Sequence, residues 1–242
     1  MWTIAKKEIN DFFSSWIGYL IITIFLTATT FFTWILDGQF NILKAGFADL
    51  NVFFALSPLL MIFLLPAICI KSFSNELKTG TIEILFSKPI KNWELVLGKF
   101  IGSFIIALYN LIPTIIYFFG IYSLKDETSS IDIGSAFGSY IGLLLLSSSF
   151  ISISIFSSVL SNNQIATFLV SIFTCFFLFF IIEFAEFISD PEIYDLINYV
   201  GIKEHYFSMT QGILSVKDIT YFIALNYLFL YLSVINLNRL KK

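Results

Sequence analysis

The chain has 242 residues and a formal net charge of −3, with 57% hydrophobic and only 13% charged residues. Soluble domains carry about 25% charged residues, and a domain of this size has too little interior to bury so much apolar surface. The composition therefore excludes a soluble globular domain, and it excludes a disordered chain, which would be polar and poor in aromatic residues. The small net charge gives no reason to expect nucleic acid as a partner. We expect an all-α integral membrane protein.

The first 15 residues carry an amphipathic pattern. Apolar residues recur at helical spacing on one face, at Trp2, Ala5, Ile9, Phe12 and Trp16, and polar residues lie on the other face. The pattern predicts an N-terminal amphipathic helix over residues 1–15 that lies in the membrane interface. A polar lead-in to the first span is the alternative.

Six apolar stretches are long enough to cross a bilayer, which takes about 20 residues in a helix. They run over residues 16–36, 52–70, 95–122, 133–160, 165–188 and 219–237. Lys and Arg indicate the orientation because they accumulate in cytoplasmic loops. Ten of the 14 fall on the side of the two termini and of the 71–93 connection. The sequence thus predicts six transmembrane helices with both termini cytoplasmic.

The 71–93 connection is the longest one on the predicted cytoplasmic side. Gly80 can end a first short helix in a left-handed conformation, and Thr81 can cap a second one. Pro89 ends that second helix, and Asn92 can cap the third span. We expect a short amphipathic helix along the cytoplasmic face. The residue pattern alone leaves two interpretations open: a helix that docks in a groove of a cytoplasmic partner, or an ordinary interfacial loop helix.

The fourth predicted span carries a ridge of small residues. Gly134, Gly138 and Gly142 follow one another at four-residue spacing, which predicts the close approach of another helix. Packing within the chain is the favoured interpretation, and a place in a dimer interface or a translocation path is the alternative. Serines from Ser147 to Ser158 continue this span and can add interhelical hydrogen bonds.

Few ionisable residues fall near the predicted spans. Glu183 and Glu186 lie one helical turn apart near the outer end of the fifth span, where they line an outer vestibule or are simply solvated. Lys99 lies near the start of the third span and can extend its ammonium group to the interface. No ionisable residue falls deep in a span, which argues against a proton- or ion-coupled transporter. The single histidine, His205, and the two cysteines form no metal-ligand or catalytic pattern, so we expect no metal site and no catalytic residue.

Residues 76–99 resemble the signature of type-2 ABC exporter permeases. That signature has acidic and basic residues, Gly-Thr-x-Glu, a Leu, a Pro, and Gly-Lys entering the next span. The matching residues are Glu76, Lys78, Gly80, Thr81, Glu83, Leu85, Pro89, Gly98 and Lys99. A second similar stretch begins at His205, as H-Y-F-S-M-T-Q-G-I-L, with Asp218 and Tyr221 opening the last span. Among these permeases, the chain looks most like the gliding-motility-associated subgroup.

The resemblance implies a single permease domain over residues 1–242 with a coupling helix in the 71–93 connection. It implies that a separate cytoplasmic ATP-binding subunit, in two copies, contacts this loop. The implied contact residues are Glu76, Lys78, Gly80, Thr81, Glu83, Leu85 and Pro89. It also implies a dimer, formed with a second copy of the permease or with a related membrane subunit, surrounded by membrane lipids.

The chain has no Walker A motif, since Gly98-Lys99 is followed by Phe100 and no Gly stands five residues before Gly98. We therefore expect ATP and Mg²⁺ on the partner, no cofactor on this chain and no enzymatic activity of its own. The absence of an HExxH pattern argues against a membrane enzyme acting on lipid. The implied function is ATP-driven export across the bacterial inner membrane, associated with gliding motility. A non-transporting membrane anchor of a motility or secretion machine is the alternative.

Overall fold

A computed structural model describes residues 1–44, 50–124, 133–185, 197 and 199–241, and these residues contain helices and connections but no strand. The elements in chain order are α1 (Trp2–Phe13), α2 (Trp16–Thr30), η1 (Phe31–Ile35), η2 (Ile42–Lys44), α3 (Asn51–Cys69), α4 (Ser74–Thr79), α5 (Ile82–Ser87), α6 (Asn92–Leu111), η3 (Ile112–Thr114), α7 (Ile115–Leu124), α8 (Ile133–Leu160), α9 (Gln164–Ala185), α11 (Ile202–Thr210) and α12 (Val216–Leu240).

Six helical stretches are long and apolar enough to cross a membrane, which confirms the predicted all-α fold with six potential spans. They are Trp16–Ile35, Asn51–Thr79, Asn92–Ser123, Ile133–Leu160, Gln164–Phe184 and Val216–Leu240. The end of the fifth predicted span, residues 186–188, lies outside the described residues.

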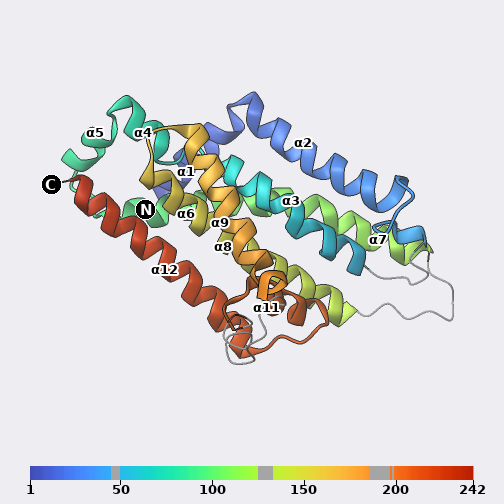
Figure 1. Cartoon of the computed structure of the whole chain (residues 1–242). Coiled ribbons are helices and arrows are strands. Elements are labelled where there is room, and N and C mark those ends of the chain that lie inside the picture. The colour runs from blue at the N-terminus through green and yellow to red at the C-terminus, as the bar shows by residue number, and fades with distance from the viewer. Residues whose placement is uncertain (45–49, 125–132, 186–196, 198, 242) are drawn as a thin grey trace.

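Helix α8 is the centre of the bundle. It packs against α3, α6, α9, α11 and α12, and Figure 1 shows it among these helices. In its most apolar window 78% of the residues are buried, compared with 22% in α12. The outer helices therefore direct many large apolar side chains outward, as at Ile165 and Phe173 in α9. Exposed apolar side chains of this kind suit contact with membrane hydrocarbon or with another protein.

The serines of α8 mainly satisfy their own helix. All seven serines between Ser147 and Ser158 donate to a carbonyl three or four residues earlier. Two of them also contact other helices: Ser147 Oγ lies 3.3 Å from the Met61 sulfur, and Ser148 accepts from Asn226 Nδ2 at 2.7 Å. Within the described residues, the predicted interhelical contacts are therefore found at two positions, and the other serines contribute small volume.

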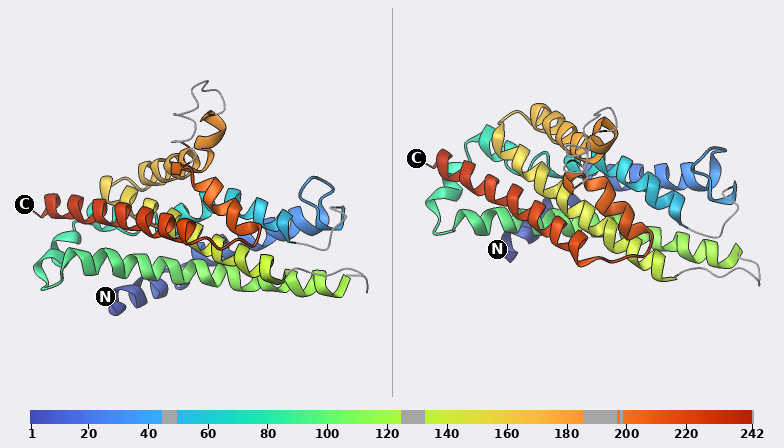
Figure 2. Two further views of the ribbon diagram at one scale, coloured as in Figure 1. Left: turned by 90° about the horizontal axis from the view of Figure 1, so that it is seen from below. Right: turned by 60° about the horizontal axis from the view of Figure 1, so that its bottom comes forward.

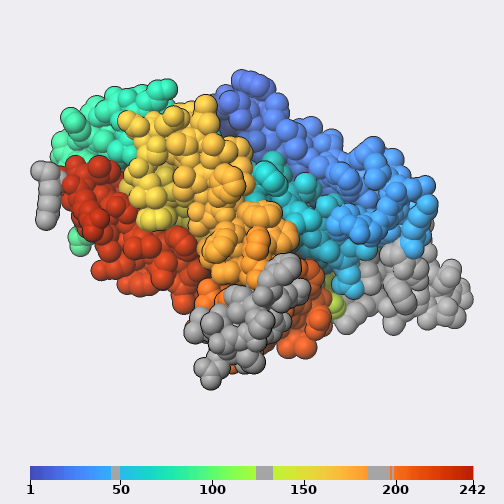
Figure 3. Space-filling view, viewed as in Figure 1, coloured from blue at the N-terminus to red at the C-terminus, as the bar shows by residue number. Residues whose placement is uncertain are grey.

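Helices α4 and α5 and the end of α12 lie at one end of the bundle, and the N-terminus lies toward the same end (Figure 1, Figure 2). Asn92 Nδ2 donates to Asn238 Oδ1 at 2.7 Å, and the Lys241 ammonium lies 5.9 Å from the centroid of the Phe86 ring. In the space-filling view α5 lies beside the last turns of α12 (Figure 3). The Lys-rich segments thus share one end, and the cytoplasmic location of that end stays a prediction.

The third potential span is interrupted at a proline. α6 ends at Leu111, the 3₁₀ turn η3 contains Pro113, and α7 continues the path. Proline has no backbone N–H and clashes with the preceding turn, so the regular α-helical ladder is interrupted there. Thr114 Oγ1 donates to Leu111 O at 2.7 Å, which satisfies a carbonyl at the interruption.

Candidate functional site

The 71–93 connection folds into the two short helices α4 and α5. Gly80 separates them in the left-handed conformation predicted for it, with φ 70° and ψ 1°. Nothing lies within 4 Å of where its Cβ would be, so the requirement for glycine is conformational rather than steric. Thr81 holds the N-cap position of α5 without a capping hydrogen bond from its side chain, and its hydroxyl bonds to that of Thr79 at 2.9 Å.

The start of α6 differs from the prediction by one residue. Lys91 is the N-cap, and its N–H donates to Glu94 Oε2 at 3.4 Å. Asn92, predicted to be the cap, uses its side chain to bind Asn238 instead. The prediction for Asn92 is wrong because Lys91 already has the extended backbone of an N-cap, with φ −74° and ψ 141°, and Asn92 is the first residue of the helix. The Asn92 amide fastens the end of the connection to α12.

Of the seven residues predicted to contact a partner, five are exposed, one is half-buried and one is buried. The exposed ones are Lys78, Gly80, Thr81, Glu83 and Pro89, and Leu85 is half-buried. Ile84 is 60% exposed and adds an apolar side chain to this surface. Glu76 is buried, which leaves it little surface for direct contact with another subunit.

Glu76 belongs to a buried ion cluster built around Lys99, whose side chain is 2% exposed. Lys99 Nζ lies 3.0 Å from Glu76 Oε1 in α4 and 2.8 Å from Glu8 Oε1 in α1. It also donates to Ser72 O at 2.5 Å and lies 4.7 Å from the centroid of the Phe73 ring. The predicted extension of Lys99 to the interface is therefore wrong: carboxylates from two other elements meet its ammonium group inside the protein.

Two glycines beside Lys99 bring α1 against α6. A Cβ at Gly98 would lie 2.8 Å from Ile4 Cβ and 2.9 Å from Met1 O. A Cβ at Gly102 would lie 2.9 Å from Glu8 Cβ and 3.0 Å from Ala5 O. Such distances exclude any larger residue without a shift, so these glycines form the seat of α1 on α6. The sequence analysis missed this seat, although the spacing of the two glycines was visible.

The glycines singled out in α8 have two different environments. Gly138 and Gly142 lie against α11 and the turn after it: a Cβ at Gly138 would be 3.1 Å from Met209 O, and one at Gly142 would be 3.0 Å from Met209 Cβ. Gly134 is exposed. Helix α11 is also fixed by Tyr206, whose hydroxyl donates to Phe54 O at 2.7 Å. Burial raises the pKa of the Tyr206 hydroxyl well above its usual range, so this donor keeps its proton.

Of the two predicted vestibule residues, Glu183 is half-buried and forms an ion pair with Lys203 of α11. Glu186 lies outside the described residues. Among the described residues, no group of three or more His, Cys, Asp and Glu side chains could hold a metal ion.

A polar pocket of about 550 Å³ lies between α11 and the start of α12. His205 and Asp218, both buried, line it, and His205 Nδ1 lies 2.7 Å from Asp218 Oδ1. The other ring nitrogen, Nε2, lies 3.2 Å from Tyr199 O, and the imidazole stacks on the Tyr221 ring at 3.9 Å between centroids. The sequence analysis placed His205, Asp218 and Tyr221 in one similar stretch but did not predict that they touch.

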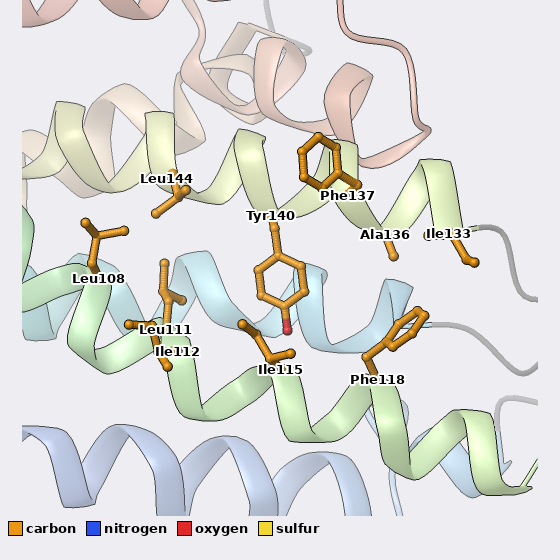
Figure 4. Close-up of a pocket in the computed structure, with 10 residues that line it drawn as sticks. All are labelled: Leu108, Leu111, Ile112, Ile115, Phe118, Ile133, Ala136, Phe137, Tyr140 and Leu144. Carbon is orange, nitrogen blue, oxygen red and sulfur yellow. The ribbon is translucent and has the colours of Figure 1, made fainter.

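An apolar pocket of about 340 Å³ lies beside the 3₁₀ turn of the third potential span, between α6–η3–α7 and α8 (Figure 4). Leu108, Ile112, Phe118 and Phe137 are among the side chains around it (Figure 4). The hydroxyl of Tyr140 lies 3.2 Å from Thr114 Oγ1. This lining suits hydrocarbon and offers no charged group to a polar ligand.

The chain belongs to the ABC-2 transporter family: the model described as ABC-2 family transporter protein matches residues 2–237. The chain is also similar to a protein of Pseudomonas aeruginosa named "Probable ABC transporter permease protein NosY", with 29% identity over 151 residues. That alignment covers 60% of this chain and 54% of the relative, so the chain spans about half the length of the curated relative it matches. The family and the six potential spans together indicate that the chain is a multi-pass membrane protein.

Proposed function

We propose that the chain is the transmembrane permease subunit of an ABC exporter in a bacterial inner membrane, and that the exposed surface of α4 and α5 contacts its ATP-binding subunit. The observation that carries the proposal is the position of this surface. It stands at one end of a bundle of potential spans, beside the ends of α1 and α12 (Figure 1). Membership of the ABC-2 family supports the partner, since ATP hydrolysis in such a transporter requires a nucleotide-binding subunit and this chain has no Walker A motif.

The chemistry of the surface fits a docking contact. Ile84 is 60% exposed and flanked by the exposed carboxylate of Glu83, while Ile82 of the same helix is buried against the bundle. An amphipathic helix held in this way presents one apolar side chain and one charge to a groove. The connection is tied down on two sides, by Asn75 to Gln164 at 3.2 Å and by Asn92 to Asn238, so a load on α5 is borne by the bundle.

Co-purification with the ATP-binding subunit tests the contact. Glu83→Lys and Ile84→Ser should each reduce recovery of the subunit at least tenfold, because they reverse the charge and remove the apolar side chain of the contact. Glu204→Lys, an exposed charge reversal on α11, is the matched control and should leave recovery unchanged. Equal recovery in all three variants would remove the α4–α5 surface from the interface.

Export itself, and its association with gliding motility, rest on the resemblance of residues 76–99 and of the stretch from His205. Reconstitution of the chain with its ATPase in vesicles distinguishes export from the alternative of a non-transporting anchor. ATP-dependent flux of a candidate substrate into or out of the vesicles supports export. ATPase activity without flux of any candidate substrate supports the anchor.

A further inference from the structure

Lys99 is placed to do more than neutralise carboxylates. An ammonium group has three N–H donors, and Lys99 Nζ meets three acceptors: Glu8 Oε1 in α1, Glu76 Oε1 in α4, and Ser72 O in the turn before α4. One side chain of α6 therefore binds two other elements at once. Both side-chain bonds are charge-assisted, which makes them shorter and stronger than bonds between neutral groups.

The charges of the cluster balance. Lys7 Nζ lies 3.8 Å from Glu76 Oε1, so two cations face two anions. The Lys7 side chain is 60% exposed and the Lys99 side chain is 2% exposed. Water therefore screens the outer pair much more than the inner ones, and the buried contacts of Lys99 fix the geometry.

The cluster bridges α1 and α4, two helices that do not pack closely against each other. The close packing of α1 is with α6 and α2, whereas that of α4 is with α5, α8 and α9. Gly98 and Gly102 hold α1 against α6. The contacts of Glu76 with Lys99 and Lys7 add a direct side-chain tie between α4 and these two helices, which α4 otherwise reaches through α8.

We propose that Lys99 is a positioning residue that joins α1, α4 and α6 into one rigid unit, so that a displacement of the α4–α5 segment moves α1 and α6 with it. The rigid unit is a property of this chain alone. The proposal rests on the proposed function only for the source of the displacement, the ATP-binding subunit.

Distances between spin labels test the rigid unit in the full chain, embedded in lipid nanodiscs without a partner. One label is attached at Lys6→Cys in α1 and the other at Ser87→Cys in α5, both exposed positions, while the native Cys69 and Cys175 are buried. We expect one narrow distance distribution. In Lys99→Met/Glu8→Gln/Glu76→Gln, which exchanges Lys99 and its two carboxylate partners for neutral side chains of similar size, we expect a distribution at least twice as wide.

The variants separate positioning from mere stability. The triple variant should melt near the parent temperature, since a complete buried ion cluster can be exchanged for neutral groups with little loss. Lys44→Met/Asp37→Asn, which removes an exposed ion pair, is the control and should not widen the distribution. An unchanged width in the triple variant overturns the proposal. If that variant does not fold, Glu8→Met decides in the same way, because it removes the acceptor that α1 presents to Lys99 and leaves Lys99 paired with Glu76.

A second arm adds the ATP-binding subunit. Labels at Lys6→Cys and Glu204→Cys report the movement of α1 relative to α11 when ATP is added. We expect the triple variant to keep the subunit bound but to lose at least half of this movement; a full movement overturns the transmission step. If the ATP-binding subunit binds neither the parent chain nor the triple variant, the result counts against the proposed function. The widths of the distance distributions in the first experiment then still test the rigid unit.

Discussion

Replacing Lys99 by Met isolates the energy of the buried cluster. Met keeps much of the length of the lysine stem but removes the cation, so Glu8 and Glu76 face one another without it. Their side chains are 19% and 11% exposed, and water cannot fully take the place of the ammonium group. Removing one partner of a buried ion pair costs about 3–5 kcal/mol. That is a large share of a total stability of about 5–15 kcal/mol.

An exposed ion pair elsewhere in the chain provides a matched comparison. Lys44 and Asp37 form an ion pair at 2.9 Å with side chains that are 60% and 74% exposed. Exposed pairs contribute about 0–1 kcal/mol, so Lys44→Met should cost several times less than Lys99→Met. Unfolding in mixed micelles, followed by tryptophan fluorescence, measures both free energies. A loss for Lys99→Met no greater than that for Lys44→Met would refute the burial argument. Adding Glu8→Gln and Glu76→Gln should recover most of the loss.

Three further predictions concern single contacts. Gly102→Val should push α1 off α6, because even a Cβ would lie 3.0 Å from Ala5 O. Maleimide labelling of Ala5→Cys should then become faster. Gly134→Val, at an exposed glycine, is the control and should leave the labelling unchanged. Gly80→Ala should lower the free energy of unfolding by about 1–2 kcal/mol, because of the left-handed backbone alone. Gly212→Ala should lower it more, because φ is 81° there and a Cβ would also lie 3.1 Å from Ser135 Cα. Equal melting temperatures of the two variants would contradict this. Asp218→Asn should cost about 1.5–3 kcal/mol by weakening the bond to His205, measured by thermal unfolding against the exposed-site control Glu204→Gln.

Local features of the fold were predictable from the sequence because their causes are local. The apolar runs indicated six potential spans, and Gly80 between two short polar-apolar segments indicated a left-handed helix end, which the structure has. The cap of α6 was misplaced by one residue because the helix already begins at Asn92, whose side chain contacts Asn238, 146 residues away in the chain. No local pattern reveals such a contact.

The site was predictable only in part. The matching signature located the 71–93 connection, but it did not distinguish the exposed Glu83 from the buried Glu76. Glu8 and Lys99 lie 91 residues apart, and no periodicity connects them. A signal was nevertheless present: Gly98 and Gly102 flank Lys99 at the spacing that admits another helix, so a buried partner for that lysine could have been expected there.

The interruption at Pro113 has a mechanical consequence. The path from Asn92 to Ser123 has 32 residues, or about 48 Å at about 1.5 Å per residue, whereas the hydrocarbon of a bilayer is about 30 Å thick. A straight helix of that length would need a tilt beyond the usual range of about 0–40°. The regular hydrogen-bond ladder is interrupted at Pro113, between α6 and α7. Helices kink most readily at such a residue, so we expect this path to respond to a change in bilayer thickness at Pro113, well beyond Lys99 in the chain.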